Sequence, residues 1–136
     1  MSQWHRIAME MLPAKAQTAK AAQSLHDLWF TLLVDFQDAY RKVPPDQELI
    51  EQIWAFAKWC YAPGRHKFVR GAVAASFFEH LPHFGPARRE MPARLTQQQL
   101  AELEPYFKVT LRAIELDAFH RELRVWHREH RNSAAT

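Results

Sequence analysis

Apolar residues recur every three or four positions along most of the chain, which is the spacing of one face of an α-helix. The longest series of this kind begins at Leu25 and ends before Pro44-Pro45. Thr96 and Gln99 have the spacing of a capping box, which opens a further helix that Pro105 kinks or divides. Helices are therefore predicted over residues 3–12, 24–42, 47–61, 66–81 and 113–130, with one more after Thr96.

Residues 66–81 differ from the other predicted helices because apolar side chains surround the helix axis on every side. A helix of that kind is buried. Pro82, Pro86 and Pro92 follow it, and they predict a loop over residues 82–95. The pattern predicts an all-α fold, a compact orthogonal bundle of five to six helices around a central buried helix at about 66–81.

The length and composition predict one helical domain over residues 1–136, with a frayed tail at 132–136. Hydrophobic residues make up 48% and charged residues 24%, as in ordinary globular domains. Cys60 is the single cysteine and has no partner for an internal disulfide. No apolar stretch reaches the ~20 residues that span a bilayer, and the first residues lack the apolar core of a signal peptide. A cytoplasmic location without membrane association is expected.

The chain lacks the motifs that nucleophilic and phosphate chemistry need. There is no GxSxG, GxxxxGK[ST] or GxGxxG sequence, and three glycines leave little material for a phosphate-cradling loop. We therefore predict no catalytic residue and no cofactor, and the sequence argues against an enzyme.

The eight histidines raise the question of a metal site. His80 and His83 are three residues apart, as are His127 and His130, so each pair could hold one ion on a helix face. No HExxH, paired CxxC or comparable ligand set completes either pair. We predict no metal, and a metal or small-ligand site at Glu79, His80 and His83 is kept as an alternative.

Glu79 is the most unusual charged residue, because it falls in the last turn of the predicted central helix. The helix dipole and burial both disfavour a carboxylate there, so Glu79 needs a cation or hydrogen-bond donors. Arg70 is one candidate partner, and Arg88, Arg89 and Arg94 are others. Two interpretations remain open, a structural ion pair or a ligand site shared with His80.

Four arginines share one side of the last predicted helix and form a basic stripe: Arg121, Arg124, Arg128 and Arg131. Residues 65–94 are also basic. Such surfaces can follow a phosphate backbone. Glu122 and Glu129 interrupt the stripe, and no established nucleic-acid module is present. A solvated helix face is the favoured interpretation, and a nucleic-acid-associated protein is the alternative.

Surplus apolar surface favours a protein partner over nucleic acid. Phe30 and Val34 give the predicted 24–42 helix a second apolar side. The flank of Trp59 adds apolar surface on the predicted 47–61 helix. A helix with two apolar sides packs against a further neighbour or another chain. The leading hypothesis is a non-enzymatic interaction module, of adaptor or immunity type, that binds another protein or a second copy of itself.

Part of the sequence resembles a family of small bacterial helical proteins that is described as a domain of unknown function. The resemblance lies in Trp59-Cys60, Ala72-Val73 and the Phe77-Phe78-Glu79-His80-Leu81 segment, within residues 46–111. It implies an all-α fold and a bacterial, cytoplasmic origin, and it implies no activity. It singles out Glu79 and His80 as positions of interest.

Overall fold

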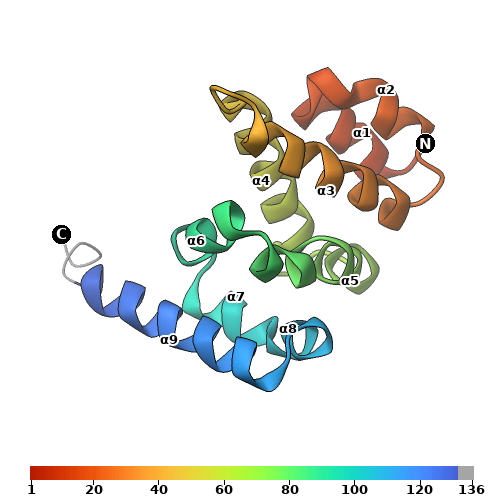
Figure 1. Ribbon diagram of the computed structural model, residues 1–136. Helices are drawn as coiled ribbons and strands as arrows, with labels where there is room; N and C mark the ends of the chain where they lie inside the picture. Colours follow the sequence, from red (N-terminus) through yellow and green to blue (C-terminus); the bar gives the residue numbers. More distant parts are fainter. Residues whose placement is uncertain (132–136) are drawn as a thin grey trace. The chain divides into compact units, whose positions relative to one another are not determined.

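The computed structural model describes residues 1–131 of the chain (Figure 1). These residues form nine α-helices and two short 3-10 helices, without a strand, which confirms the all-α class. By internal contacts the chain divides into two compact units, Met1–Phe77 and Phe78–Thr136. The single-domain organisation stays a prediction, and the expected frayed tail at 132–136 lies outside the described residues.

The first unit follows the predicted helices closely up to residue 61. Ser2, Ser24 and Asp46 each precede a helix and accept the backbone N–H three residues further on, which satisfies a donor that the helix leaves unpaired. The elements of this unit are α1 (Gln3–Met11), the 3-10 helix η1 (Pro13–Lys15), α2 (Ala16–Ala21), α3 (Leu25–Arg41), α4 (Gln47–Tyr61) and α5 (Lys67–Ser76).

Aromatic side chains from α3, α4 and the end of α5 form the centre of this unit. The Trp29 ring lies 5.1 Å from Phe56 and 4.7 Å from Phe77, and Phe36 meets both Phe77 and Trp54 edge-on. All five side chains are buried. Offset and edge-to-face pairs of this kind add to the stabilisation from burial alone, so they fix how the three helices pack.

The predicted central helix 66–81 is shorter and less buried than expected. It ends at Ser76, and residues 78–83 form a separate 3-10 helix, η2 (Phe78–His83), which contains Pro82. α5 packs against both α3 and α4, yet its Phe68 side is open: Phe68 is 53% exposed, and Gly71 and Ala75 are half-buried. The predicted helix was apolar on every side because it contains several alanines and a glycine. Such small residues do not indicate which side of a helix packs against a neighbour.

The second unit contains more helix than expected. Its elements are η2, α6 (Gly85–Arg94), α7 (Gln97–Glu102), α8 (Glu104–Thr110) and α9 (Ala113–Glu129). The loop predicted over residues 82–95 was wrong, because Pro86 sits in the first turn of α6, where a missing N–H removes no hydrogen bond. Helices α2 and α6 and the division of the helix after Thr96 into α7 and α8 explain why the described residues hold nine α-helices where five to six were predicted.

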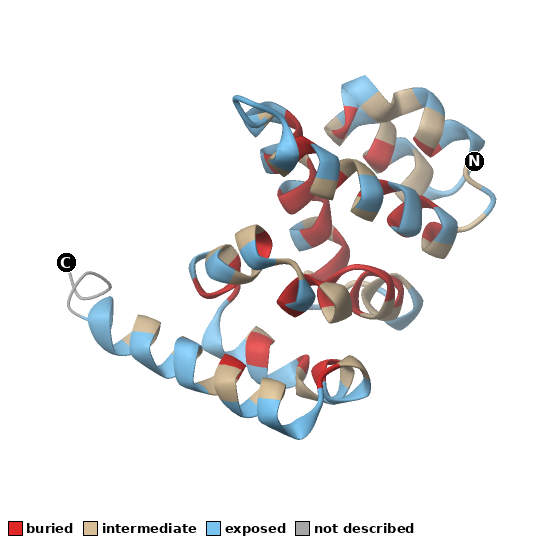
Figure 2. Cartoon of the chain, viewed as in Figure 1, coloured by how far each residue is buried: buried red, intermediate tan, exposed pale blue. Residues whose placement is uncertain are grey.

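The capping box at Thr96 is confirmed. Thr96 Oγ1 accepts the Gln99 N–H at 3.0 Å, and Gln99 Oε1 accepts the Thr96 N–H at 2.9 Å. Phe107 of α8 and Phe119 of α9 meet edge-to-face at 5.3 Å in the core of this unit. Phe119 is the buried residue of α9, and the turns after it are mostly exposed (Figure 2). Among residues 1–131, no helix is both long enough and apolar enough to cross a membrane.

Candidate functional site

Large apolar side chains are exposed together on α3 and α5 of the first unit. Phe30 is 53% exposed and Val34, one turn later on α3, is 56% exposed. Phe68 of α5 is 53% exposed, and its ring meets the His26 ring edge-on with 6.1 Å between the centroids. His26 lies one turn before Phe30 on α3, so Phe68 and Phe30 belong to the same side of the helix pair.

Two small residues of α5 lie on the same helix face as Phe68. Gly71 and Ala75 are three and seven residues after Phe68, which places them on the same face of the helix. A Cβ atom added at Gly71 would meet no atom within 4 Å, so the surface beside Phe68 is open there. We call Phe30, Val34, Phe68, Gly71 and Ala75 the α3–α5 apolar face.

A buried polar contact holds the two helices of this face together. Ser76 is 1% exposed, and its Oγ lies 2.7 Å from Nδ1 of the half-buried His26. A serine–histidine pair is also the start of a nucleophilic site, but an attacking hydroxyl must be reachable by substrate. Ser76 is covered, so this pair is structural and fixes α3 against α5.

Trp59, the third predicted partner residue, does not join the α3–α5 apolar face. It is half-buried on α4, where its ring stacks on Phe56 at 6.1 Å. The Arg65 guanidinium lies 3.8 Å from the Trp59 ring centroid, and Arg65 Nε donates a hydrogen bond to the Trp59 carbonyl. The Arg65 guanidinium therefore covers one face of the Trp59 ring, and a partner contact at Trp59 stays a prediction.

Arg70 repeats the contact that Arg65 makes. Its Nε donates to the Tyr61 carbonyl at 3.2 Å, and its guanidinium lies 4.3 Å from the Tyr61 ring centroid. Both arginines thus bind carbonyls at the C-terminal end of α4, where cations are favoured by the helix dipole. This part of the basic segment 65–94 has a structural role.

Glu79 lies in η2 of the second unit, with its side chain 14% exposed. Within residues 78–131, its carboxylate has one ion-pair partner, His80 Nε2 at 3.8 Å, which is charged only when protonated. The Glu79 carbonyl accepts a hydrogen bond from Thr110 Oγ1 at 3.2 Å. Of the loop arginines considered as partners, Arg88 pairs with Glu122 and Arg94 with Glu90.

Metal and thiol chemistry gain no support from the geometry. Among residues 1–131, no three His, Cys, Asp or Glu side chains approach closely enough to hold a metal ion, and this includes Glu79, His80 and His83. Cys60 is buried, and burial raises the pKa of its thiol to about 12, although the Trp29 side chain and the Arg65 charge lower it slightly. A thiol with that pKa is a neutral core residue at physiological pH.

The arginine stripe lies on the exposed side of α9. A groove of about 970 Å³ runs between α6 and α9 and contains Arg121. A second hollow, of about 870 Å³, contains Arg124, Arg128 and Arg131 and shares Trp126 with the first. The stripe is therefore divided between two concave surfaces, which its spacing in the sequence did not indicate.

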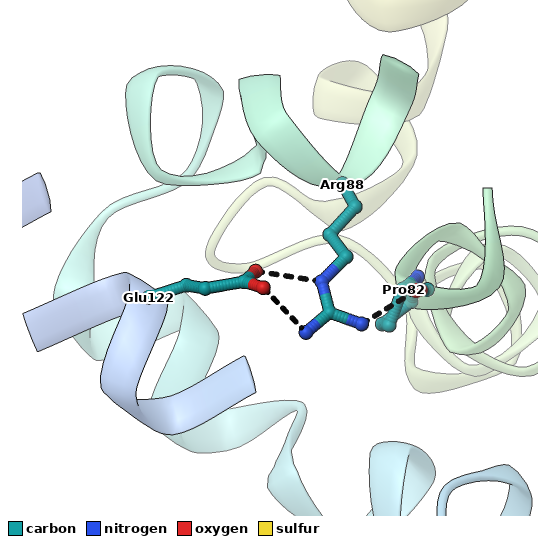
Figure 3. A network of polar contacts seen from close by, with 3 residues as sticks. All are labelled: Pro82, Arg88 and Glu122. Atoms are coloured by element: carbon teal, nitrogen blue, oxygen red, sulfur yellow. Dashed lines mark hydrogen bonds and ion pairs between the residues drawn. The ribbon is translucent and has the colours of Figure 1, made fainter. Parts of the chain in front are cut away.

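Arg88 lines the α6–α9 groove and makes three hydrogen bonds to Glu122 and Pro82 (Figure 3). Its Nε and one terminal nitrogen donate to the two Glu122 carboxylate oxygens at 2.7 and 2.9 Å, and the other terminal nitrogen donates to the Pro82 carbonyl at 3.1 Å. The guanidinium also lies 5.1 Å from the Phe119 ring centroid. One side chain thus joins η2, α6 and α9.

Comparison with known proteins found no matching protein-family model, no similar curated protein and no similar solved structure. The resemblance to a bacterial helical family therefore stays a prediction.

Proposed function

We propose that this chain is a protein-interaction module, of adaptor or immunity type, that binds through the α3–α5 apolar face. The observation that carries the proposal is the exposure of Phe30, Val34 and Phe68, each above one half, on one side of two adjacent helices. Scattered exposed apolar residues are ordinary, whereas a contiguous group with a polar rim marks a binding surface. Covering the exposed half of each side chain gives about 1 kcal/mol.

The shape of the face supports a helical partner. Gly71 and Ala75 present almost no side chain on the face of α5 that carries the larger Phe68. Small residues allow another backbone to approach closely, and an amphipathic helix can place its apolar side chains beside them. The rim carries Asp27, Thr31 and Lys67, which are exposed and of mixed charge. A surface of this composition favours a protein over a nucleic acid or an anionic membrane.

Two substitutions test this proposal without altering the core. Gly71→Glu places a charge where the structure has open space, and Val34→Asp replaces an exposed apolar side chain. Val43→Asp is the matched control, because Val43 is 97% exposed in the same unit and lies outside the face. Circular dichroism and thermal melts establish that all three variants fold.

Binding is measured in two ways. Sedimentation velocity over a wide concentration range reports self-association, and affinity capture from the native host with quantitative mass spectrometry reports a second protein. The wild type and Val43→Asp should bind the same species, and Gly71→Glu and Val34→Asp should lose it. Equal binding by all four proteins, or no binding by any of them, contradicts the proposal.

A further inference from the structure

The hollow at the end of α9 is lined mostly by basic and aromatic side chains. Its lining comprises three arginines, two histidines, one tryptophan and one glutamine, and it contains no carboxylate: Arg124, Trp126, His127, Arg128, His130, Arg131 and Gln97 of α7. The chain as a whole has almost as many acidic as basic residues, with 18 lysines and arginines against 15 aspartates and glutamates. A concave surface with several cations and no anion is thus a local feature.

The acidic residues of α9 do not offset these arginines as the sequence suggested. Both oxygens of Glu122 are bound by Arg88 on the α6 side of the helix (Figure 3). Glu129 lines the α6–α9 groove and not this hollow. Among residues 1–131, no carboxylate forms an ion pair with Arg124, Arg128 or Arg131. Their charges are therefore available to an anionic ligand.

An aromatic stack lies beside the arginines. The rings of Trp126 and His130 are 3.9 Å apart at the centroids and inclined by 11°, so they are stacked face to face. His130 is exposed and Trp126 half-buried, so the stack borders solvent. Trp126 lies on α9 and His130 is the C-cap residue four positions later, so the stacked pair is a preformed flat surface on which a planar ring can stack.

We infer that this hollow binds single-stranded nucleic acid. Guanidinium groups hold phosphates, and unpaired bases stack on aromatic side chains and on guanidinium planes, which are the two contacts that strand-binding proteins combine. Arg124, Arg128 and Arg131 would hold the backbone, and the Trp126–His130 stack would receive a base. This function is separate from the protein-binding face of the first unit and does not depend on it.

The chemistry favours a single strand over other anionic partners. In a duplex the bases are paired and stacked on one another, so the Trp126–His130 stack would contribute nothing. An acidic peptide satisfies the arginines and leaves the stack unused. The C-terminal end of a helix carries a partial negative charge, which weakens anion binding there. The expected dissociation constant is therefore in the weak, sequence-independent range, about 10⁻⁴ to 10⁻⁶ M at physiological salt.

Fluorescence anisotropy with a labelled oligothymidylate tests the inference on the full chain. Binding should weaken with salt, with a slope of log K against log salt of about −2, because each of three phosphates contributes roughly 0.7. An abasic strand and a duplex of the same length should both bind several-fold more weakly than the oligothymidylate. Equal affinity for all three probes, or no binding at low salt, would overturn the inference.

Variants assign the binding to the hollow. Arg124→Glu with Arg128→Glu should weaken binding by about tenfold or more, since both side chains are exposed and would contact phosphate in the inferred complex. Arg6→Glu with Lys20→Glu is the control of equal charge change, on exposed positions of the first unit. Both double variants binding alike would reduce the effect to net charge and overturn the site.

The aromatic stack needs its own pair of variants. Trp126→Ala should remove the preference for the oligothymidylate over the abasic strand, and Trp126→Phe should keep most of it. If Trp126→Ala does not fold, His130→Ala provides the same comparison, because His130 is exposed. A preference for bases that survives in the folded alanine variant would show that stacking occurs elsewhere and would contradict the assignment.

Discussion

Removing the Arg88 side chain should destabilise the second unit mainly through the Pro82 carbonyl and much less through the ion pair. The Arg88 side chain is 19% exposed, and it donates to the carbonyl of the buried residue Pro82. A hydrogen bond from a charged donor contributes about 1.5–3 kcal/mol. Glu122 is 58% exposed, so its pair with Arg88 is screened by solvent and contributes less than about 1 kcal/mol. Arg88→Ala should cost about 3 kcal/mol and Glu122→Ala under 1 kcal/mol.

A double-mutant cycle separates the two contributions. The free energy of unfolding is measured by urea titration for wild type, Arg88→Ala, Glu122→Ala and the double variant. The coupling energy between the two side chains should be about 0.5–1 kcal/mol, and added salt should reduce it. A coupling energy as large as the whole effect of Arg88→Ala would show that the ion pair dominates, and the reasoning from burial would be wrong.

Three further substitutions test single features of the fold. Gly71→Ala should raise the stability by about 0.5–1 kcal/mol, because Gly71 is helical and its Cβ would meet open space; a lower melting temperature would contradict this. Cys60 should react with thiol reagents at pH 8 only after unfolding, and the stability should fall between about pH 9 and 12, where the unfolded thiol ionises and the buried one, with a pKa of about 12, does not. Cys60→Ala should make that alkaline decline in the urea-measured stability smaller, and an unchanged decline would contradict the burial of the thiol. Thr96→Ala removes the side-chain cap of α7 and should cost about 1 kcal/mol, and a change near zero would show that the capping box is dispensable.

Local signals predicted the helices whose ends are set by neighbouring residues. Asp46 opens α4 and the turn at Pro63-Gly64 follows it, and both are visible in the sequence because a cap and a turn depend on a few adjacent residues. Helix α6 was missed because its prolines suggested a loop, whereas Pro86 in a first turn removes no hydrogen bond. The presence of a proline does not show whether it lies in the first turn of a helix, where it is tolerated, or in a loop.

The candidate surfaces were predictable only in part. Phe30 and Val34 were found because α3 has apolar residues on two sides, and a single helix buries one side in its own unit. Phe68 was missed, since an alanine-rich helix does not show which side packs. The charged Lys67 beside it was the hint that the sequence offered. The Arg88–Glu122 pair joins residues 34 apart in the sequence, so no local pattern could indicate it.

The most direct test of the proposed interaction is site-specific photo-crosslinking in the native host. A benzoylphenylalanine residue is incorporated at Gly71, where the structure has open space, or at Val43, the exposed control outside the α3–α5 apolar face. The account predicts one adduct of defined mass from position 71, either a second copy of the chain or another protein, that position 43 does not form. No adduct from position 71, or the same adducts from both positions, would contradict the claim that this face binds a protein.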